Sequence, residues 1–146
     1  MFSPLARAAA TLAVGLATQV MLPAKTIFVD SRVSKPGKGS SWTAAYADLH
    51  SALAAASSGD EIWVARGVYR PGHSRSSTFN LVHGVKIYGG FLGTESSRSA
   101  RIPESHLTIL SGDIDDNDLT DETGVTRDPD HIRGANAYSV VTAGSA

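Results

Sequence analysis

Three short runs of β-prone residues, each followed by glycine, constrain the fold of this chain more than any other feature. They cover residues 61–65, 85–91 and 107–111. Their central residues Val64, Ile87 and Ile109 follow one another at nearly equal intervals, as in stacked repeats. Short strands at a regular spacing, with glycines that allow sharp bends at their ends, predict successive turns of a solenoid.

A helix is predicted before these strands, over residues 42–56. Its apolar residues recur at intervals that place them on one helical face: Trp42, Ala45, Tyr46, Leu49, Leu53 and Ala56. Ser40 or Ser41 is expected to cap its start and Gly59 to close its end. Because this single apolar stripe fits one partner surface, the helix is expected to cover the first turn of the solenoid. Further strands are expected over residues 26–30, 78–82 and 138–142.

A β-sandwich or open sheet built from hairpins is the alternative fold. Its strands would be joined by tight two-residue turns such as Asn-Gly or Asp-Gly. None of the links between these strands is such a turn, and His83-Gly84 is the nearest approach. The pattern therefore favours the solenoid.

The N-terminus has the pattern of a secretory signal. Arg7 precedes an uncharged run, residues 8–22, which is short for a bilayer span of about 20 residues. We expect residues 1–24 to be a signal peptide, cleaved after Ala17 or Ala24, and the protein to be secreted or on the cell surface. An N-terminal amphipathic or buried helix is the alternative. No later segment has the length and apolarity of a transmembrane helix.

The charge balance gives no footprint for a nucleic acid. Without residues 1–24, the chain has 12 Lys and Arg against 14 Asp and Glu, a balance of −2. The absence of cysteine excludes disulfides and thiolate metal sites. The charges are unevenly placed, because residues 113–130 contain eight acidic side chains and one basic side chain.

This acidic segment is the candidate metal site. Its hard oxygen donors are closely spaced: Asp113, Asp115, Asn117, Asp118 and Asp121. Such donors suit Ca²⁺, so these five residues are predicted to bind calcium. The segment begins like an EF-hand loop, but Asp118 replaces the turn glycine and Gly124 stands where the bidentate glutamate belongs. A solvated acidic loop is the alternative, since charge runs are commonly hydrated surface.

Three phrases carry a resemblance to a known group of proteins. They read Gly-Asp-Glu-Ile-Trp-Val-Ala-Arg-Gly-Val-Tyr at 59–69, Gly-Val-Lys-Ile-Tyr-Gly-Gly-Phe at 84–91 and Thr-Ile-Leu-Ser-Gly-Asp-Ile at 108–114. Through them, residues 26–142 resemble the N-terminal region of bacterial secreted β-helix proteins of the pectate-lyase-like group. The resemblance implies a mainly β fold: a right-handed parallel β-helix of few coils with an N-terminal capping α-helix. Residues 25–146 would be the cap and first coils of an incomplete domain.

The expected function is a non-catalytic extracellular or cell-surface module for adhesion, display or carbohydrate contact, because this fold hosts many functions and no catalytic constellation is visible. One alternative is a Ca²⁺-assisted polysaccharide lyase or hydrolase of the same group, with calcium bridging an acidic sugar. The other is a truncated fragment without independent activity. The expected partner is a polysaccharide or cell-surface glycan. Self-association is expected through the open C-terminal end, residues 138–142.

Overall fold

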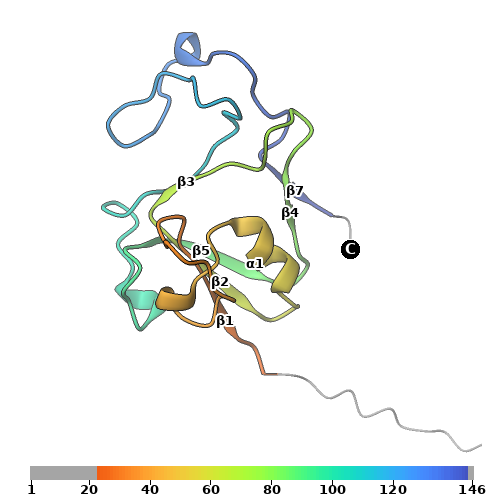
Figure 1. Cartoon of the computed structure of the whole chain (residues 1–146), viewed down its shortest axis with the longest axis vertical. Coiled ribbons are helices and arrows are strands. Elements are labelled where there is room, and N and C mark those ends of the chain that lie inside the picture. Colours follow the sequence, from red (N-terminus) through yellow and green to blue (C-terminus); the bar gives the residue numbers. More distant parts are fainter. Residues whose placement is uncertain (1–22, 145–146) are drawn as a thin grey trace, which may run out of the picture.

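The structure, a computed structural model, describes residues 23–144. Nearly all of the predicted signal peptide, including the cleavage position after Ala17, lies outside the described residues and stays a prediction. Within the described range, seven strands form three small parallel sheets (Figure 1). The strands are β1 (Thr26–Val29), β2 (Glu61–Ala65), β3 (Gly67–Tyr69), β4 (Phe79–Leu81), β5 (Lys86–Phe91), β6 (Thr108–Leu110) and β7 (Val141–Ala143).

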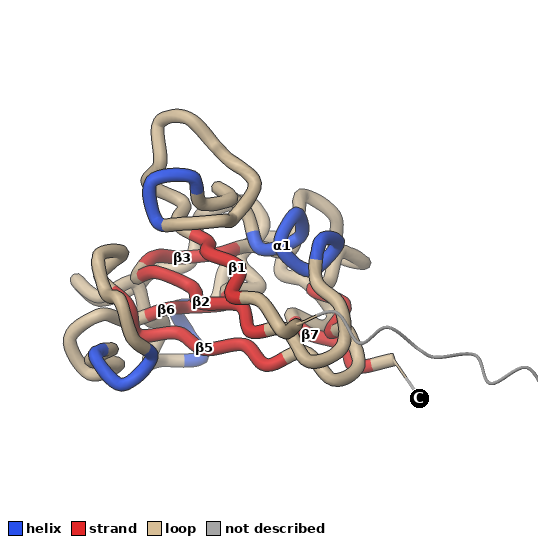
Figure 2. The backbone as a smooth tube through the Cα atoms, turned by 90° about the horizontal axis from the view of Figure 1, so that it is seen from below, coloured by secondary structure: helices blue, strands red, loops and turns tan. Residues whose placement is uncertain are grey.

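The chain visits the three sheets in a repeating order. In the first sheet β2 lies between β1 and β5, in the second β3 pairs with β6, and in the third β4 pairs with β7. The chain thus passes through all three sheets with β2, β3 and β4, and then again with β5, β6 and β7 (β4 is labelled in Figure 1 and β6 in Figure 2). Every pairing between these seven strands is parallel. This order is compatible with a parallel β-helix, whose class and hand stay predictions.

The expected stack of residues 61–65, 85–91 and 107–111 is wrong in its third member. β5 pairs with β2, but β6 pairs with β3 in another sheet. The reason is that a single residue, Arg66, separates β2 from β3 and turns the chain into the second sheet. The number of residues between paired positions differs too. Ile87 lies opposite Ile62, whereas Ile109 lies opposite Val68, from which it is separated by a much longer stretch of chain. The nearly equal intervals between Val64, Ile87 and Ile109 therefore do not reflect a structural repeat.

The single helix predicted over residues 42–56 is wrong as well. A 3₁₀ turn, η1 (Trp42–Ala44), and a short helix, α1 (Leu49–Ala55), are joined by extended backbone. Between them Tyr46 forms an isolated parallel bridge with Val29, and its N–H donates to the Phe28 carbonyl at 2.9 Å. The backbone at Tyr46 therefore extends the first sheet. It forms hydrogen bonds with β1 that it could not form as part of a continuous helix.

The helix ends also differ from the expected ones. The cap of α1 is Asp48, whose carboxylate accepts the Ser51 N–H at 2.8 Å. Ser41 precedes η1 and makes no capping hydrogen bond through its side chain. α1 ends at Ala55 with Ala56 as its C-cap, whereas Gly59 has a φ of 96° in the turn that leads into β2. Two further 3₁₀ turns are η2 (Arg98–Ala100) and η3 (Pro129–His131).

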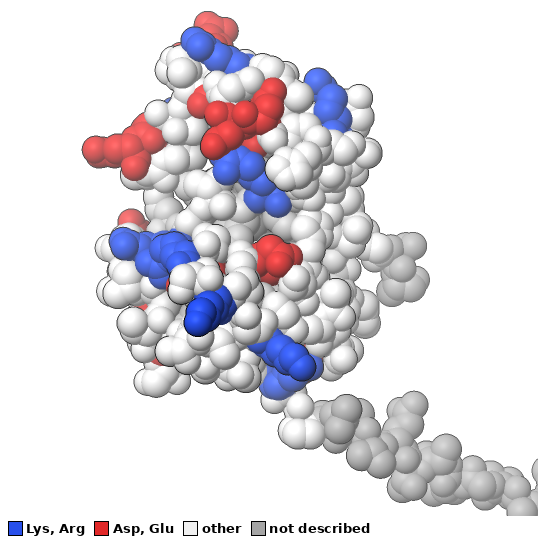
Figure 3. Space-filling model, viewed as in Figure 1, with Lys and Arg blue, Asp and Glu red and all other residues white. Residues whose placement is uncertain are grey.

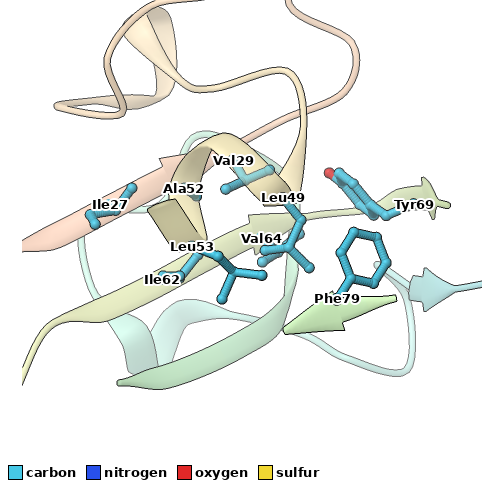
Figure 4. Packing of buried hydrophobic residues seen from close by; sticks show 9 residues of the cluster. All are labelled: Ile27, Val29, Leu49, Ala52, Leu53, Ile62, Val64, Tyr69 and Phe79. Carbon is cyan, nitrogen blue, oxygen red and sulfur yellow. The ribbon is translucent and has the colours of Figure 1, made fainter. Parts of the chain in front are cut away.

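The main core lies between α1 and the sheets (Figure 4). Its buried members are Ile27, Val29, Leu49, Ala52, Leu53, Ile62, Val64, Tyr69 and Phe79. α1 packs against β1, β2 and β4. It therefore covers the end of the core that is formed by β1 of the first sheet and β4 of the third sheet. Its apolar face thereby removes the inward side chains of these strands from water.

A second cluster of aromatic rings packs around the first sheet, apart from the main core. Phe91 stacks on Trp63 with ring centroids 4.9 Å apart and an interplanar angle of 9°. Trp42 lies 5.5 Å from Phe91 and 4.8 Å from Phe28, measured between ring centroids. The Trp42 indole N–H also donates to the carbonyl of Glu95 at 2.8 Å. Trp42 therefore belongs to this cluster, which explains why it does not share a helical face with Leu49.

Asp60 joins the start of β1 to the segment that follows α1. Its buried carboxylate accepts the N–H of Lys25 at 3.0 Å and the N–H of Ser57 at 2.8 Å, and the ammonium of Lys25 lies 3.7 Å away. Burial raises the pKa of Asp60, but these backbone donors and Lys25 outweigh it and hold the pKa below its usual value of 3.8.

We expect Asp60→Asn to lower the free energy of unfolding at neutral pH by about 1–3 kcal/mol, because a charge-assisted interaction is lost. Since the pKa of Asp60 is lower in the folded state, its stabilising contribution is complete above pH 3.8 and is lost as the pH falls below it. Urea unfolding between pH 3 and pH 7 should therefore show that the free energy of unfolding falls less toward acid pH in Asp60→Asn than in the wild type. Equal pH dependence in both proteins would contradict this role.

Candidate functional site at the acidic loop

The acidic loop, residues 112–136, connects β6 to the segment before β7 and folds back over the outer face of the second sheet. In Figure 1 it forms the blue arch beyond β3. A Cβ placed on Gly124 would lie 3.2 Å from Val68 Cγ2 and 3.5 Å from Ile109 Cδ1. Val68 and Ile109 are register partners on β3 and β6. The loop backbone therefore rests directly on aliphatic side chains of this sheet.

Asp113 anchors the first part of the loop. Its side chain is buried, and its two carboxylate oxygens accept the N–H groups of Asn117 at 3.1 Å and Asp118 at 3.2 Å. Arg70 holds it from the sheet side: Nε donates to the Asp113 carbonyl at 2.6 Å, and Nη2 lies 3.9 Å from Oδ2. Arg70 also forms an ion pair with Asp116, which has a φ of 57°. The carboxylate of Asp113 thus has a structural role.

Asp115, Asn117 and Asp118 face the return segment of the loop. Asp115 Oδ2 accepts the N–H of Ala135 at 2.9 Å, and Asp118 Oδ1 accepts the N–H of Arg133 at 2.6 Å. Gly134, with a φ of 56°, lies between these contacts, and a Cβ there would collide with the side chains of Asp115 and Asn117. These side chains therefore tie the two arms of the loop together.

Asp121 lies apart from this group, in a turn of its own. It accepts the N–H groups of Thr123 at 2.9 Å and Val125 at 3.1 Å and pairs with Arg127. Hydrogen bonds from the Thr123 hydroxyl and the Arg127 guanidinium, with those backbone N–H groups, hold the pKa of Asp121 well below its usual range. Figure 3 shows carboxylates with cationic side chains beside them on this part of the surface.

The predicted calcium ligands are thus brought near one another only in part. Their carboxylates each accept backbone N–H groups of the loop, and Asp121 is turned toward Arg127. Within residues 23–144, no group of three or more His, Cys, Asp or Glu side chains is arranged to hold a metal ion. The described side chains do not fit a calcium cage, since Ca²⁺ needs about six to eight oxygens around one point.

Calcium binding therefore remains a prediction, and we expect a Kd of about 10⁻⁴–10⁻³ M or weaker, as in extracellular modules. Tight binding is not expected because the carboxylates would have to give up their N–H partners. Calorimetric titration of the protein should be compared with the isosteric variant Asp115→Asn, Asp118→Asn. Equal heats from both proteins would show that the loop is only solvated, and a micromolar Kd would show that it rearranges into a cage.

A groove of about 400 Å³ lies beside the loop, on the outer face of β3 and β6. Its lining is drawn from the corners after β1 and β2, the segment before β6 and the tip of the acidic loop: Arg32, Arg66, Gly67, Val68, Glu104, Ser105, Leu107, Ile109, Glu122 and Thr123. Three aliphatic side chains, Val68, Leu107 and Ile109, lie among charged ones. The groove therefore combines apolar and charged surface, as ligand sites do.

The charged groups of the groove differ in their pairing. Arg32 is bound by both carboxylate oxygens of Asp30, through Nε at 2.9 Å and Nη2 at 2.8 Å, and this hydrogen bonding raises the pKa of Arg32. Arg66, Glu104 and Glu122 are exposed and have no ion-pair partner among the described residues. These three side chains are therefore available to donate to or accept from a ligand.

The sequence did not point to this groove. Arg66, Glu104 and Glu122 are isolated in the chain, and no spacing links them. The position of Arg66 between two strands was the one available signal, since a side chain at a one-residue corner points away from the core. Recognising that corner required knowing that residues 67–69 form a separate strand.

Comparison with known proteins gives no relative. No family model matches the chain, and no match was found among curated proteins or solved structures. In the part of the chain that the structure describes, no helix has the length and apolarity needed to span a membrane.

Proposed function

We propose that this chain is a non-catalytic extracellular module, the capped start of a parallel β-helix, which contacts carbohydrate through the groove on β3 and β6. The observation that carries the proposal is the pairing of an aliphatic surface with charged groups that have no ion-pair partner among the described residues. A sugar ring presents C–H groups to an apolar surface and hydroxyls that both donate and accept hydrogen bonds. Arginine donors and carboxylate acceptors at the same groove suit such a ligand.

The charges of the groove favour a neutral or amino sugar over a polyuronate. Asp30 neutralises Arg32, which leaves one other cation, Arg66, and two carboxylates, Glu104 and Glu122, in the lining of the groove. These two carboxylates repel the carboxylates of a uronate chain, because like charges across an interface are unfavourable. The proposed ligand class therefore differs from the acidic sugar that a calcium-bridged lyase would bind.

The test is calorimetric titration with neutral, amino-sugar and galacturonate oligosaccharides of equal length. We expect measurable binding of a neutral or amino-sugar chain and weaker binding of oligogalacturonate. Arg66→Ala should weaken binding about 10- to 150-fold, since a hydrogen bond to a charged group is worth about 1.5–3 kcal/mol. Lys86→Ala is the matched control, because Lys86 is an exposed cation on β5 outside the groove.

Two outcomes would contradict this function. Tighter binding of oligogalacturonate would contradict the proposed ligand class, and equal affinities for Arg66→Ala and Lys86→Ala would show that the groove is not the site. Release of shorter oligosaccharides or unsaturated uronates, followed by chromatography and ultraviolet absorbance, would support the alternative of a lyase or hydrolase. Glu104 and Glu122 would then be the first carboxylates to replace, because glycoside hydrolysis uses a pair of them.

A further inference from the structure

The buried carboxylate of Asp60 lies where the chain enters the first sheet. Asp60 is 4% exposed, and its Oδ1 accepts the backbone N–H of Lys25 at 3.0 Å. The carbonyl of Lys25 in turn accepts the N–H of Glu61 at 2.9 Å, and β1 begins at the next residue, Thr26. Among the described residues, Lys25 is therefore the first whose backbone the sheet holds.

The charge of this carboxylate is only partly compensated. The ammonium of Lys25 lies 3.7 Å from Oδ2, but its side chain is 55% exposed and donates to the Ala55 carbonyl at 3.0 Å. The other contact of Oδ2 is the N–H of Ser57 at 2.8 Å. An exposed lysine contributes little to an ion pair, whereas a buried carboxylate is stabilised by a close and well-placed positive charge. The position of the Lys25 backbone nitrogen is therefore suited to a second cation.

A free N-terminus at Lys25 would supply that cation. The sequence offers two cleavage positions for the predicted signal peptide, after Ala17 and after Ala24. A chain that begins at Lys25 has its α-amino group at the Asp60 carboxylate, whereas a chain that begins at Thr18 has an amide there. Pro23 and Ala24 are exposed, and every described helix and strand follows Lys25, so cleavage after Ala24 removes no element of the fold.

We propose that the chain is cleaved at the Ala24–Lys25 bond and that the freed α-ammonium of Lys25 pairs with the buried carboxylate of Asp60. The cleavage is a hydrolysis, in which the amide C–N bond breaks. The oxygen of water goes to the carbonyl carbon of Ala24, which leaves as a carboxylate, and the nitrogen of Lys25 takes up protons to become an ammonium.

The new N-terminus strengthens an existing contact. An α-amino group has an ordinary pKa of about 7.7–8.0, so most of it is charged at neutral pH. The neutral hydrogen bond from Lys25 to Asp60 thereby becomes a charge-assisted one, which is roughly twice as strong. Asp60 thus acts as the receptor for the mature N-terminus, and cleavage stabilises the fold.

The first test is intact-mass analysis and N-terminal sequencing of the full chain, expressed with its own N-terminus in a secreting bacterial host. We expect an N-terminus at Lys25. Leu22 is larger than the small residue usual at the third position before a cleaved bond, so Leu22→Ala should speed cleavage without moving it.

This proposal rests on the export that the proposed function implies, and it does not depend on the carbohydrate groove. An N-terminus at Thr18 would overturn cleavage after Ala24 and leave export intact. An intact Met1 would overturn both. The binding measurements at the groove are unaffected by either outcome.

The second test compares the stability of a chain that begins at Lys25 with that of a chain that begins at Thr18. We expect the folding equilibrium constant from urea unfolding to be about fivefold larger for the Lys25 form, and the difference to disappear in Asp60→Asn. Asp48→Asn is the matched control, because this exposed carboxylate caps α1 and its loss should weaken both forms equally. Equal stability of the two wild-type forms, or a difference that persists in Asp60→Asn, would overturn the pairing.

The reactivity of the α-amino group gives a readout that needs no Asp60 variant. A pyridinecarboxaldehyde reagent selective for N-terminal amines is applied to both forms, and each rate is divided by that of a short peptide with the same first residue. We expect this relative rate to be about tenfold lower for the Lys25 form, because its ammonium must leave Asp60 and lose a proton before it reacts. Equal relative rates would overturn the pairing as well.

Discussion

Leu49→Asp is expected to unfold most of the chain at room temperature. Leu49 is 1% exposed and lies in α1 against the core residues of the strands. Burying an unpaired carboxylate there costs several kcal/mol, which is comparable with the total stability of about 5–15 kcal/mol for a small domain. Circular dichroism during urea titration measures the change.

Ala54→Asp is the matched control for this variant. Ala54 lies on the same helix but is exposed, so an added carboxylate remains in water. We expect its unfolding midpoint to stay close to that of the wild type, since exposed substitutions usually change stability by less than about 0.5 kcal/mol. Similar midpoints for Leu49→Asp and Ala54→Asp would show that α1 does not cover the core.

Phe91→Ala is expected to lower the free energy of unfolding by about 3–5 kcal/mol, the usual cost of removing a buried aromatic ring. Phe91 is fully buried, stacks on Trp63 and lies beside Trp42. Its loss would leave a cavity between two indoles that are held by other contacts. Urea unfolding followed by tryptophan fluorescence reports on the same cluster.

The control for Phe91 is Tyr138→Ala, which removes an aromatic ring from the surface. Tyr138 is 76% exposed, and its ring lies 5.1 Å from the guanidinium of Arg75. Losing this cation–π contact should cost no more than about 1 kcal/mol. A loss of stability in Phe91→Ala as small as this would mean that the aromatic cluster contributes little to the fold.

Much of the strand pattern could be predicted because it is encoded locally. Residues 61–65 form the expected strand β2, and the expected strand over 85–91 is β5 from Lys86 to Phe91. Their parallel pairing also matches the expectation from glycine-bounded runs without hairpin turns. β3 was missed because a short strand directly after a sharp corner has no periodicity of its own.

The prediction of a continuous helix failed for a different reason. The positions of Trp42, Tyr46 and Leu49 match a helical period, but each of the three residues contacts a different part of the protein. Trp42 joins the aromatic cluster, Tyr46 bridges to Val29, and Leu49 enters the core. A period identifies residues that are apolar at regular intervals, and it cannot show that they face one surface.

At the candidate site too, the composition could be predicted from the sequence and the geometry could not. The acidic composition of residues 113–121 is plain in the sequence, and it predicted a metal site. The folded loop instead gives these carboxylates backbone N–H partners from residues 117–118, 123–125 and 133–135. Which donors reach a carboxylate depends on how the loop closes, and side-chain identity alone does not settle this.

The sequence by itself determined where the main strands run, where glycine permits sharp turns and which segment is acidic. These properties depend on residues close together in the chain, through alternation of apolar side chains and backbone conformation. Only the tertiary structure decided that β6 lies on β3, that Arg66, Glu104 and Glu122 share one groove, and that the carboxylate of Asp60 lies at the N–H of Lys25. Those features arise from contacts between segments that are distant in the sequence. The geometry of the corners and the lengths of the loops determine which segments meet, and a local sequence pattern does not contain this information.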